Sequence, residues 1–196
     1  MLHDIDTFLH RHPDHQVEPL FVERWSPRAM SGEPLDPGQL EQLFEAARWA
    51  PSSYNAQPWR FVYAERNSEH WDAYFDLLVE GNQRWCERAA VLMVLLSRHI
   101  AERNGEPFPS HALDTGAAWQ NLALQGAKFD LVVHGMIGFD RDRARTVVNA
   151  PDEFTVQAMI AVGRPGGLEL LSDSAREREV PSPRKTIQEI AFAGRF

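Results

Sequence analysis

The chain has 196 residues, of which 43% are hydrophobic and 24% are charged, and its formal net charge is −8. This length suits one well-buried core, so we expect a single domain over residues 1–196, with residues 1–17 as an N-terminal extension or helix. The composition is that of a folded protein rather than a disordered one. The acidic balance argues against a nucleic-acid interface over the whole surface, although local basic pockets can persist.

The sequence also indicates a cellular location. Its one cysteine, Cys86, excludes an intrachain disulfide and a CxxC pair, so we expect it to fill the core in a reducing compartment. The first residues lack a positive start followed by a long apolar run, and no segment approaches the ~20 apolar residues that cross a bilayer. We therefore expect a cytoplasmic protein without a membrane partner.

Hydrophobic periodicity predicts alternating helices and strands. We expect helices over 36–49, 68–78, 110–128 and 141–149, and strands over 59–64, 89–96, 131–133 and 156–162. Asp36 should cap the first helix, with Pro37 in its first turn. Ser68 and Ser110 should cap the next two. The run 89–96 is almost wholly apolar, which predicts a central strand buried on both faces. Strands interleaved with helices predict a layered α/β or α+β protein.

The segment from Arg24 to Arg28 carries two guanidinium groups and one hydroxyl at alternate positions, with Ser26 between the two arginines. In an extended backbone all three side chains point to one face, where they can converge on an anion such as a phosphate. The alternative is a surface strand or turn whose arginines are solvated. Spacing alone does not decide between the two.

A second polar segment follows the first predicted helix. Residues 50–59 read Ala-Pro-Ser-Ser-Tyr-Asn-Ala-Gln-Pro-Trp, a helix exit followed by two hydroxyls and two carboxamides. Ser53, Asn55 and Gln57 offer both donors and acceptors to the polar edge of a planar ring. Taken singly, these residues also fit an ordinary capped helix exit. Together with the arginine segment they suggest a nucleotide-like ligand.

Two later segments carry further polar or glycine-rich features. Residues 114–140 form an apolar helix that runs into Val-Val-His-Gly-Met-Ile-Gly-Phe-Asp, and residues 183–187 read Pro-Arg-Lys-Thr-Ile. Gly135 and Gly138 also fit a simple tight turn after a strand. Asp114 also fits an ordinary exposed acid of a helix.

Other kinds of site lack support. His10, His12 and His15 lie in a polar segment without a scaffold for coordination, so we expect exposed histidines and no metal site. The segment 163–167 lacks the GxGxxG spacing, and we expect a turn there. No GxSxG, HExxH or P-loop motif is present, so hydrolase and phosphotransfer chemistry have no visible residues.

Four segments carry a family resemblance: residues 24–28, 50–59, 114–140 and 183–187. In this order they resemble the FMN-dependent nitroreductase family, a group of flavoenzymes that use NAD(P)H. The resemblance covers roughly residues 18–190. It implies an α+β fold, a three-layer α/β/α sandwich with a central mixed sheet, built as an intertwined homodimer. It also implies two FMN sites shared between subunits, and a C-terminal segment, residues 181–196, that can pack on the partner subunit.

The resemblance implies a set of cofactor-binding residues. They are Arg24, Trp25, Ser26, Arg28, Ser53, Asn55, Gln57, Asp114, Ile137, Gly138 and Arg184. Arg24 and Ser26 would hold the phosphate and ribityl chain. Arg28 would lie at the pyrimidine edge, where a cation stabilises negative charge on the reduced flavin. The residues from 53 to 57 would reach the flavin from the partner subunit.

Some positions depart from the family pattern. The backbone N–H of Gly138 would face the ring, but Ile137 stands where many relatives have a glutamate. Asp114 stands where some relatives have a glutamine near the ring. Arg184 matches a phosphate-contacting arginine, whereas Ser182 replaces a frequent lysine, which removes one charge from the phosphate site.

The resemblance implies that a hydride from NAD(P)H reaches an electron-poor acceptor by a ping-pong mechanism, with no named catalytic side chain. Nitroaromatics, quinones, flavins and activated alkenes are all acceptors of relatives, and nothing in these residues selects among them. The loop 104–109 and the region 71–85 would form the substrate rim. Two alternatives stay open: the same fold with other flavin chemistry (dehalogenation, flavin fragmentation or heterocycle oxidation), and a flavin-binding protein without turnover.

Overall fold

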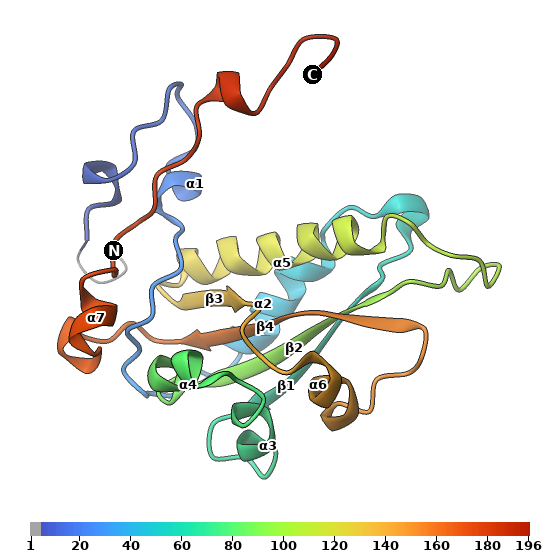
Figure 1. Cartoon of the computed structure of the whole chain (residues 1–196), viewed down its shortest axis with the longest axis horizontal. Helices are drawn as coiled ribbons and strands as arrows, with labels where there is room; N and C mark the ends of the chain where they lie inside the picture. Colours follow the sequence, from blue (N-terminus) through green and yellow to red (C-terminus); the bar gives the residue numbers. More distant parts are fainter. Residues whose placement is uncertain (1–4) are drawn as a thin grey trace.

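A four-stranded sheet forms the centre of the protein in the computed structural model, which describes residues 5–196 (Figure 1). The strands are β1 (Trp59–Glu65), β2 (Val91–Arg98), β3 (Val132–Met136) and β4 (Phe154–Gly163), and they lie in the order β1-β2-β4-β3. All three hydrogen-bonded pairs are antiparallel. The expected mixed sheet is therefore wrong for this chain. The reason is that the strands that run in the same direction, β1 with β4 and β2 with β3, are each separated by an antiparallel strand.

Helices cover both faces of the sheet, which confirms the three-layer α+β architecture (Figure 1). On one face lie α2 (Gln39–Arg48) and α5 (His111–Lys128); on the other lie α3 (Trp71–Phe75), α4 (Glu80–Cys86) and α6 (Arg141–Val147). The core has one part on each face, and β2 contributes alternate side chains to both. Its residues 91–96 are all buried, as the apolar run predicted.

Helix starts differ from the predicted ones at two places. α2 begins at Gln39 and not at Pro37, because residues 36–39 form a turn in which Gly38 has φ 84°. That left-handed conformation suits glycine. Ser68 does not cap a long helix either: α3 begins at Trp71 and ends at Phe75, and a separate helix, α4, follows. Ser110 stands directly before α5, as expected, but its side chain caps no backbone N–H and donates to the Asp114 carboxylate instead.

The two terminal segments lie side by side at one end of the sheet (Figure 1). The N-terminal one contains η2 (Thr7–Leu9), a short helix within the predicted extension or helix of residues 1–17, and α1 (Pro19–Glu23), which was not predicted. Residues 1–4 of that prediction lie outside the described residues. After β4 the chain forms η4 (Leu168–Leu170), α7 (Asp173–Arg176) and η5 (Ile187–Glu189), and its last residues extend away from the body. Cys86 is buried in the core, as expected, and burial raises the pKa of its thiol. Within residues 5–196, none of the helices is both long and apolar enough to span a membrane.

Candidate functional site

The arginine segment, residues 24–28, contacts β3, the strand at the edge of the sheet. The ring nitrogen Nδ1 of His134, on β3, lies 2.8 Å from the carbonyl oxygen of Pro27, so Nδ1–H donates to that oxygen. Burial lowers the pKa of His134, and the positive charge of Arg28 lowers it further, so the ring is neutral at pH 7. The segment is thereby attached to the sheet edge by a neutral histidine.

Side chains in this segment alternate between the core and the surface, as the spacing predicted. Trp25 is only 4% exposed and packs in the core, which leaves only its backbone available to a ligand. Arg24, Ser26 and Arg28 are partly exposed. Arg24 Nη1 lies 3.4 Å from Ser26 Oγ, a weak contact that keeps the guanidinium near the hydroxyl.

Three arginines from distant parts of the chain meet beside this segment, and we call Arg11, Arg24 and Arg184 the arginine cluster. The Ser182 carbonyl oxygen accepts from both Arg11 Nε (3.0 Å) and Arg184 Nη1 (3.1 Å). Arg11 Nη1 also donates to the Arg24 carbonyl at 2.8 Å. Arg24 and Arg184 were predicted to share a phosphate site, and the structure brings them together. Arg11 was not predicted.

The electrostatics of the arginine cluster favour an anionic ligand. Burial lowers the pKa of Arg11 to about 10, and the charges of Arg184 and Arg24 lower it further. Burial also lowers the pKa of Arg24, again with a contribution from Arg184. Across the described part of the chain, no carboxylate forms an ion pair with any of the three. An anion placed here would relieve their mutual repulsion and gain charge-assisted hydrogen bonds.

Arg28 is held differently. Its guanidinium lies 3.1 Å from the carboxylate of Glu179, and that carboxylate also accepts the backbone N–H groups of Arg28 and, at 3.0 Å, of Ala29. Glu179 is only 1% exposed. Sequence patterns gave no indication of Glu179. Its negative charge partly neutralises Arg28, the residue that was predicted to face the pyrimidine edge.

The loop of residues 51–58, which we call the Asn55 loop, has an unusual backbone. Tyr54, Asn55 and Gln57 have φ values of 52°, 55° and 47°, a left-handed region that non-glycine residues rarely adopt. Ser52 Oγ accepts from the Gln57 N–H at 3.0 Å, which stabilises the turn. Strain of this kind in a polar exposed loop is typical of binding sites.

Asp114 anchors this loop to the first turn of α5. Its carboxylate accepts the Ser53 N–H and the Ser110 hydroxyl, both at 3.1 Å. Asp114 is 7% exposed, so the alternative of an ordinary exposed acid is wrong. Because both bonds go to protein groups, Asp114 positions the Asn55 loop whether or not it contacts a ligand.

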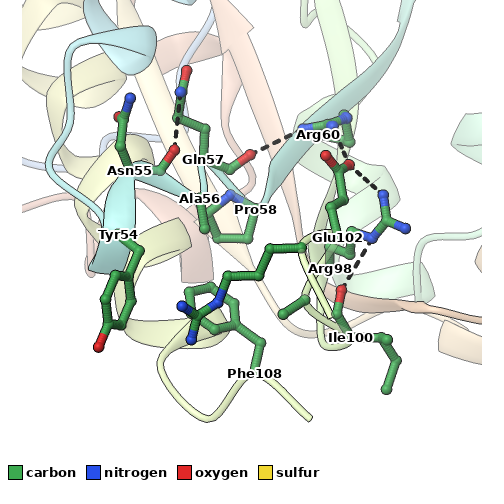
Figure 2. Close-up of a pocket in the computed structure, with 12 residues that line it drawn as sticks. Tyr54, Asn55, Ala56, Gln57, Pro58, Arg60, Arg98, Ile100, Glu102 and Phe108 are labelled. Carbon is green, nitrogen blue, oxygen red and sulfur yellow. Dashed lines mark hydrogen bonds and ion pairs between the residues drawn. The ribbon is translucent and has the colours of Figure 1, made fainter. Parts of the chain in front are cut away.

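A pocket of about 420 Å³ lies beside the Asn55 loop (Figure 2). Arg60, Arg98 and Glu102 gather on one side of it, and Tyr54 and Phe108 lie on the other. Glu102 forms ion pairs with Arg98 and, at 3.8 Å, with Arg60. The pocket thus combines aromatic surface with a cationic wall that Glu102 partly neutralises.

The two regions predicted as the substrate rim lie in different places. Phe108, from the loop 104–109, lines the pocket. No residue from 71–85 does, because α3 and α4 lie on the other face of the sheet.

Gly138 and Ile137 follow β3 directly. Ile137 is 75% exposed, so this position faces away from the protein. The Gly138 carbonyl accepts from Asn82 Nδ2 at 2.9 Å and from the Val79 N–H at 3.1 Å. A Cβ at position 138 would come within 2.7 Å of Asn82 Nδ2, so a larger residue would have to displace the Asn82 carboxamide. Asn82 therefore brings a carboxamide to this turn. Sequence patterns gave no indication of this role, because a single asparagine in a short helix is not a motif.

One chain does not bring all the predicted residues together. The Asn55 loop is tied to the first turn of α5 through Asp114. The arginine segment contacts β3 at His134, and β3 packs against the middle and the end of α5 at Trp119 and Gly126. In Figure 1 the two lie toward opposite ends of α5. No group of histidine, cysteine or acidic residues that could hold a metal occurs within residues 5–196.

Comparison with known proteins gives consistent matches. The model of the nitroreductase family matches residues 22–164. A Thermus thermophilus protein named NADH dehydrogenase is 26% identical over 179 residues, which cover 74% of this chain and 84% of that protein. A Streptomyces coelicolor protein, whose name joins NADH dehydrogenase and NAD(P)H nitroreductase, is 33% identical and covers 76% of this chain and 82% of its own. A crystal structure described as an oxidoreductase containing FMN matches with a TM-score of 0.91 and 43% identity, covering 95% of this chain and 96% of that one.

Proposed function

The chain belongs to the nitroreductase family, and we propose that it is an FMN-dependent oxidoreductase that takes a hydride from NAD(P)H and delivers it to an electron-poor acceptor. The observation that carries this proposal is the arginine cluster, which has no acidic partner among the described residues and lies beside the segment predicted to bind a phosphate. We further propose that the whole chain acts as one FMN-binding domain in the cytoplasm.

The residues present fit FMN at its charged end. Arg24 and Arg184 would hold the phosphate, because planar guanidinium groups bind its oxygens through paired N–H donors. Ser26, 3.4 Å from Arg24, would bind the ribityl chain. None of the carboxylates within residues 5–196 has to be displaced from these arginines.

The flavin ring, when bound, supplies the hydride chemistry, so this chain's residues need only position it and set its electrostatics. Arg28 would stabilise negative charge at the pyrimidine edge, with Glu179 holding its guanidinium in place at 3.1 Å. Ile137 and Gly138 would flank the ring, supported by Asn82, which donates to the Gly138 carbonyl. Position 137, where many relatives have a glutamate, holds an isoleucine and so offers no carboxylate to the ring.

We propose that the second half of each site comes from a partner subunit. Ser53, Asn55 and Gln57 lie on the Asn55 loop, away from the arginine segment of their own chain. Two large apolar side chains near this loop, Trp49 and Leu113, are mostly exposed, which is typical of a surface that a second copy covers. A homodimer would then contain two equivalent sites.

The pocket in Figure 2 would admit the acceptor, because it adjoins the loop that reaches the partner's flavin. NAD(P)H and the acceptor would use the same opening in turn, which makes the mechanism ping-pong. Its aromatic residues, Tyr54 and Phe108, suit planar acceptors such as nitroaromatics, quinones or flavins. Activated alkenes are a further acceptor class.

The first test is the visible spectrum of the purified protein before and after anaerobic addition of NADH or NADPH, with the released cofactor identified by mass. Bound FMN that bleaches within seconds is expected. A colourless protein that neither retains added FMN nor oxidises NAD(P)H would refute the proposal. Tight FMN binding without reduction would favour a flavin-binding protein instead.

A mixed dimer tests the shared site directly. Arg24→Gln and Asn55→Ala should each lose FMN binding as homodimers. When the two variants are co-expressed and the mixed dimer is isolated with two affinity tags, one site per dimer contains both intact halves. One FMN per mixed dimer is expected, whereas none would show that each chain builds its own site.

A further inference from the structure

Arg11 lies in the N-terminal extension, outside the residues 22–164 that the family model matches. We infer that Arg11 supplies a third cation to the phosphate site and thereby determines the preference of this protein for FMN over riboflavin, the flavin without phosphate. The inference rests on the proposed function, because it concerns the same site.

The hydrogen bonds of Arg11 leave one end of its guanidinium free. The Nε group donates to the Ser182 carbonyl at 3.0 Å, and Nη1 donates to the carbonyls of Val22 at 2.7 Å and Arg24 at 2.8 Å. An arginine has five N–H donors, so these three bonds use all of them except the two on Nη2. Residues 5–196 provide no acceptor for Nη2. This nitrogen is accessible to solvent, because it is absent from the buried atoms that lack a partner.

The surroundings of Arg11 are those of an anion site. Its side chain is 8% exposed, yet its neighbours are carbonyl oxygens and two further arginines rather than a carboxylate. Arg184 Nη1 shares the Ser182 carbonyl with Arg11 Nε, which places the two guanidinium groups side by side. A buried cation without a counterion is costly, so the structure is consistent with an anion that completes it.

Phosphate is the anion that fits this cluster. The phosphate of FMN carries close to two negative charges at neutral pH and presents three oxygens as acceptors. Two arginines contribute at most two charges, and both are partly committed to nearby carbonyl and hydroxyl groups. The free Nη2 of Arg11 still has two N–H donors, and a charge-assisted hydrogen bond from either of them can reach a phosphate oxygen.

A purely structural role is the competing explanation, because Arg11 also joins the N-terminal extension, α1 and the C-terminal segment through three carbonyls. The two explanations predict different results for the two flavins. A structural clamp that shapes the whole site weakens the binding of both flavins. A clamp that only positions Arg24 and Arg184 weakens FMN binding as much in Arg11→Lys as in Arg11→Gln, because lysine does not rebuild the three carbonyl contacts. A phosphate ligand affects only FMN, because riboflavin has no group for it to bind.

The test measures Kd for FMN and for riboflavin by fluorescence quenching, on full-length protein freed of its flavin. Arg11→Gln is expected to raise the Kd for FMN about 10- to 100-fold, as expected for one lost charge-assisted contact, and to leave the Kd for riboflavin nearly unchanged. Arg11→Lys keeps the charge but has three donors in place of five, so its Kd for FMN should fall between those of the wild type and Arg11→Gln. Arg178→Gln, an exposed arginine whose Nε binds Ser174, is the control and should change neither value.

Equal losses for both flavins in Arg11→Gln would overturn the inference and establish the clamp. Unchanged affinity for FMN would also overturn it. If Arg11→Gln fails to fold, Arg11→Lys gives the same FMN-to-riboflavin comparison. Inorganic phosphate provides a second measurement: it should raise the Tm of the flavin-free wild type more than that of Arg11→Lys. Should the wild type bind neither flavin, the proposed function fails, and phosphate protection still decides whether Arg11 belongs to an anion site.

Discussion

Replacement of Glu179 by alanine should be the most destabilising polar substitution near the arginine segment. Its carboxylate, fully enclosed, accepts the backbone N–H groups of Arg28 and Ala29 as well as the guanidinium of Arg28. Alanine leaves two backbone donors without an acceptor, at about 1–3 kcal/mol each, but Arg28 is 32% exposed and can recover some hydration. We expect a net loss of about 3 kcal/mol in unfolding free energy.

For a domain of this size about 1 kcal/mol corresponds to about 2–4 °C, so the Tm of Glu179→Ala should fall by about 6–12 °C. Thermal unfolding followed by circular dichroism measures this shift. Glu179→Gln keeps an oxygen for the backbone donors but loses the charge, so it should lose only about 1 kcal/mol. Glu177→Ala, two residues earlier and exposed, is the control. If Glu179→Ala unfolds at the temperature of the control, the carboxylate does not hold the segment and the argument fails.

Three further predictions concern other contacts. Gly126→Ala should destabilise the protein by about 1–3 kcal/mol in urea unfolding, because the added Cβ overlaps Val133 and forces α5 away from β3. Asp114→Ala should speed hydrogen exchange in residues 50–58, since the Ser53 N–H loses its acceptor, at a cost of about 1–2 kcal/mol. His134 should make stability pH-dependent: its pKa is lowered in the folded state, so its contribution is complete above pH 6.5 and is lost as the pH falls below it. Urea midpoints at pH 7.5 and 5 should therefore differ less in His134→Asn than in the wild type.

Matched controls make these three predictions decisive. Gly81→Ala, at an exposed position with no atom near the added Cβ, should be neutral or slightly stabilising. Asp142→Asn, in the first turn of α6, should leave exchange of residues 50–58 unchanged. His70→Asn, at an exposed histidine, should keep the pH dependence of the wild type. A control that matches its test variant in any pair would contradict the contact assigned there.

Local sequence patterns predicted most of the fold. The apolar run 89–96 identified β2 because a strand buried on both faces needs no polar side. Periodicity identified α2 and α5, but not the start of α2, since the turn at Gly38 depends on a left-handed backbone that hydrophobic spacing does not encode. The pairing of β4 between β2 and β3 was also out of reach, because periodicity says nothing about strand order.

In the candidate site, too, local features could be predicted from the sequence and long-range contacts could not. Alternation over residues 24–28 predicted which side chains face outward, and the structure agrees. Arg11 and Glu179 were missed because their partners are far away in sequence: 171 residues separate Arg11 from Ser182, and 151 separate Glu179 from Arg28. Asp114 makes one contact that sequence spacing can predict and one that it cannot. Its contact with Ser110, four residues earlier, follows helix spacing, whereas its contact with Ser53, 61 residues away, does not.

The two missed residues hold the arginine segment by opposite chemistry. Arg11, a cation, binds the carbonyl oxygens of Val22 and Arg24 at the start of the segment. Glu179, an anion, binds the N–H groups of Arg28 and Ala29 at its end. The backbone polar groups at both ends are thus satisfied from the two terminal parts of the chain, which leaves the side chains of Arg24 and Ser26 free to face a ligand. Removal of residues 180–196 should leave the Glu179 contact in place but take away Arg184 and the Ser182 carbonyl. The affinity for FMN should therefore fall strongly, whereas the Tm of the flavin-free protein should fall only slightly.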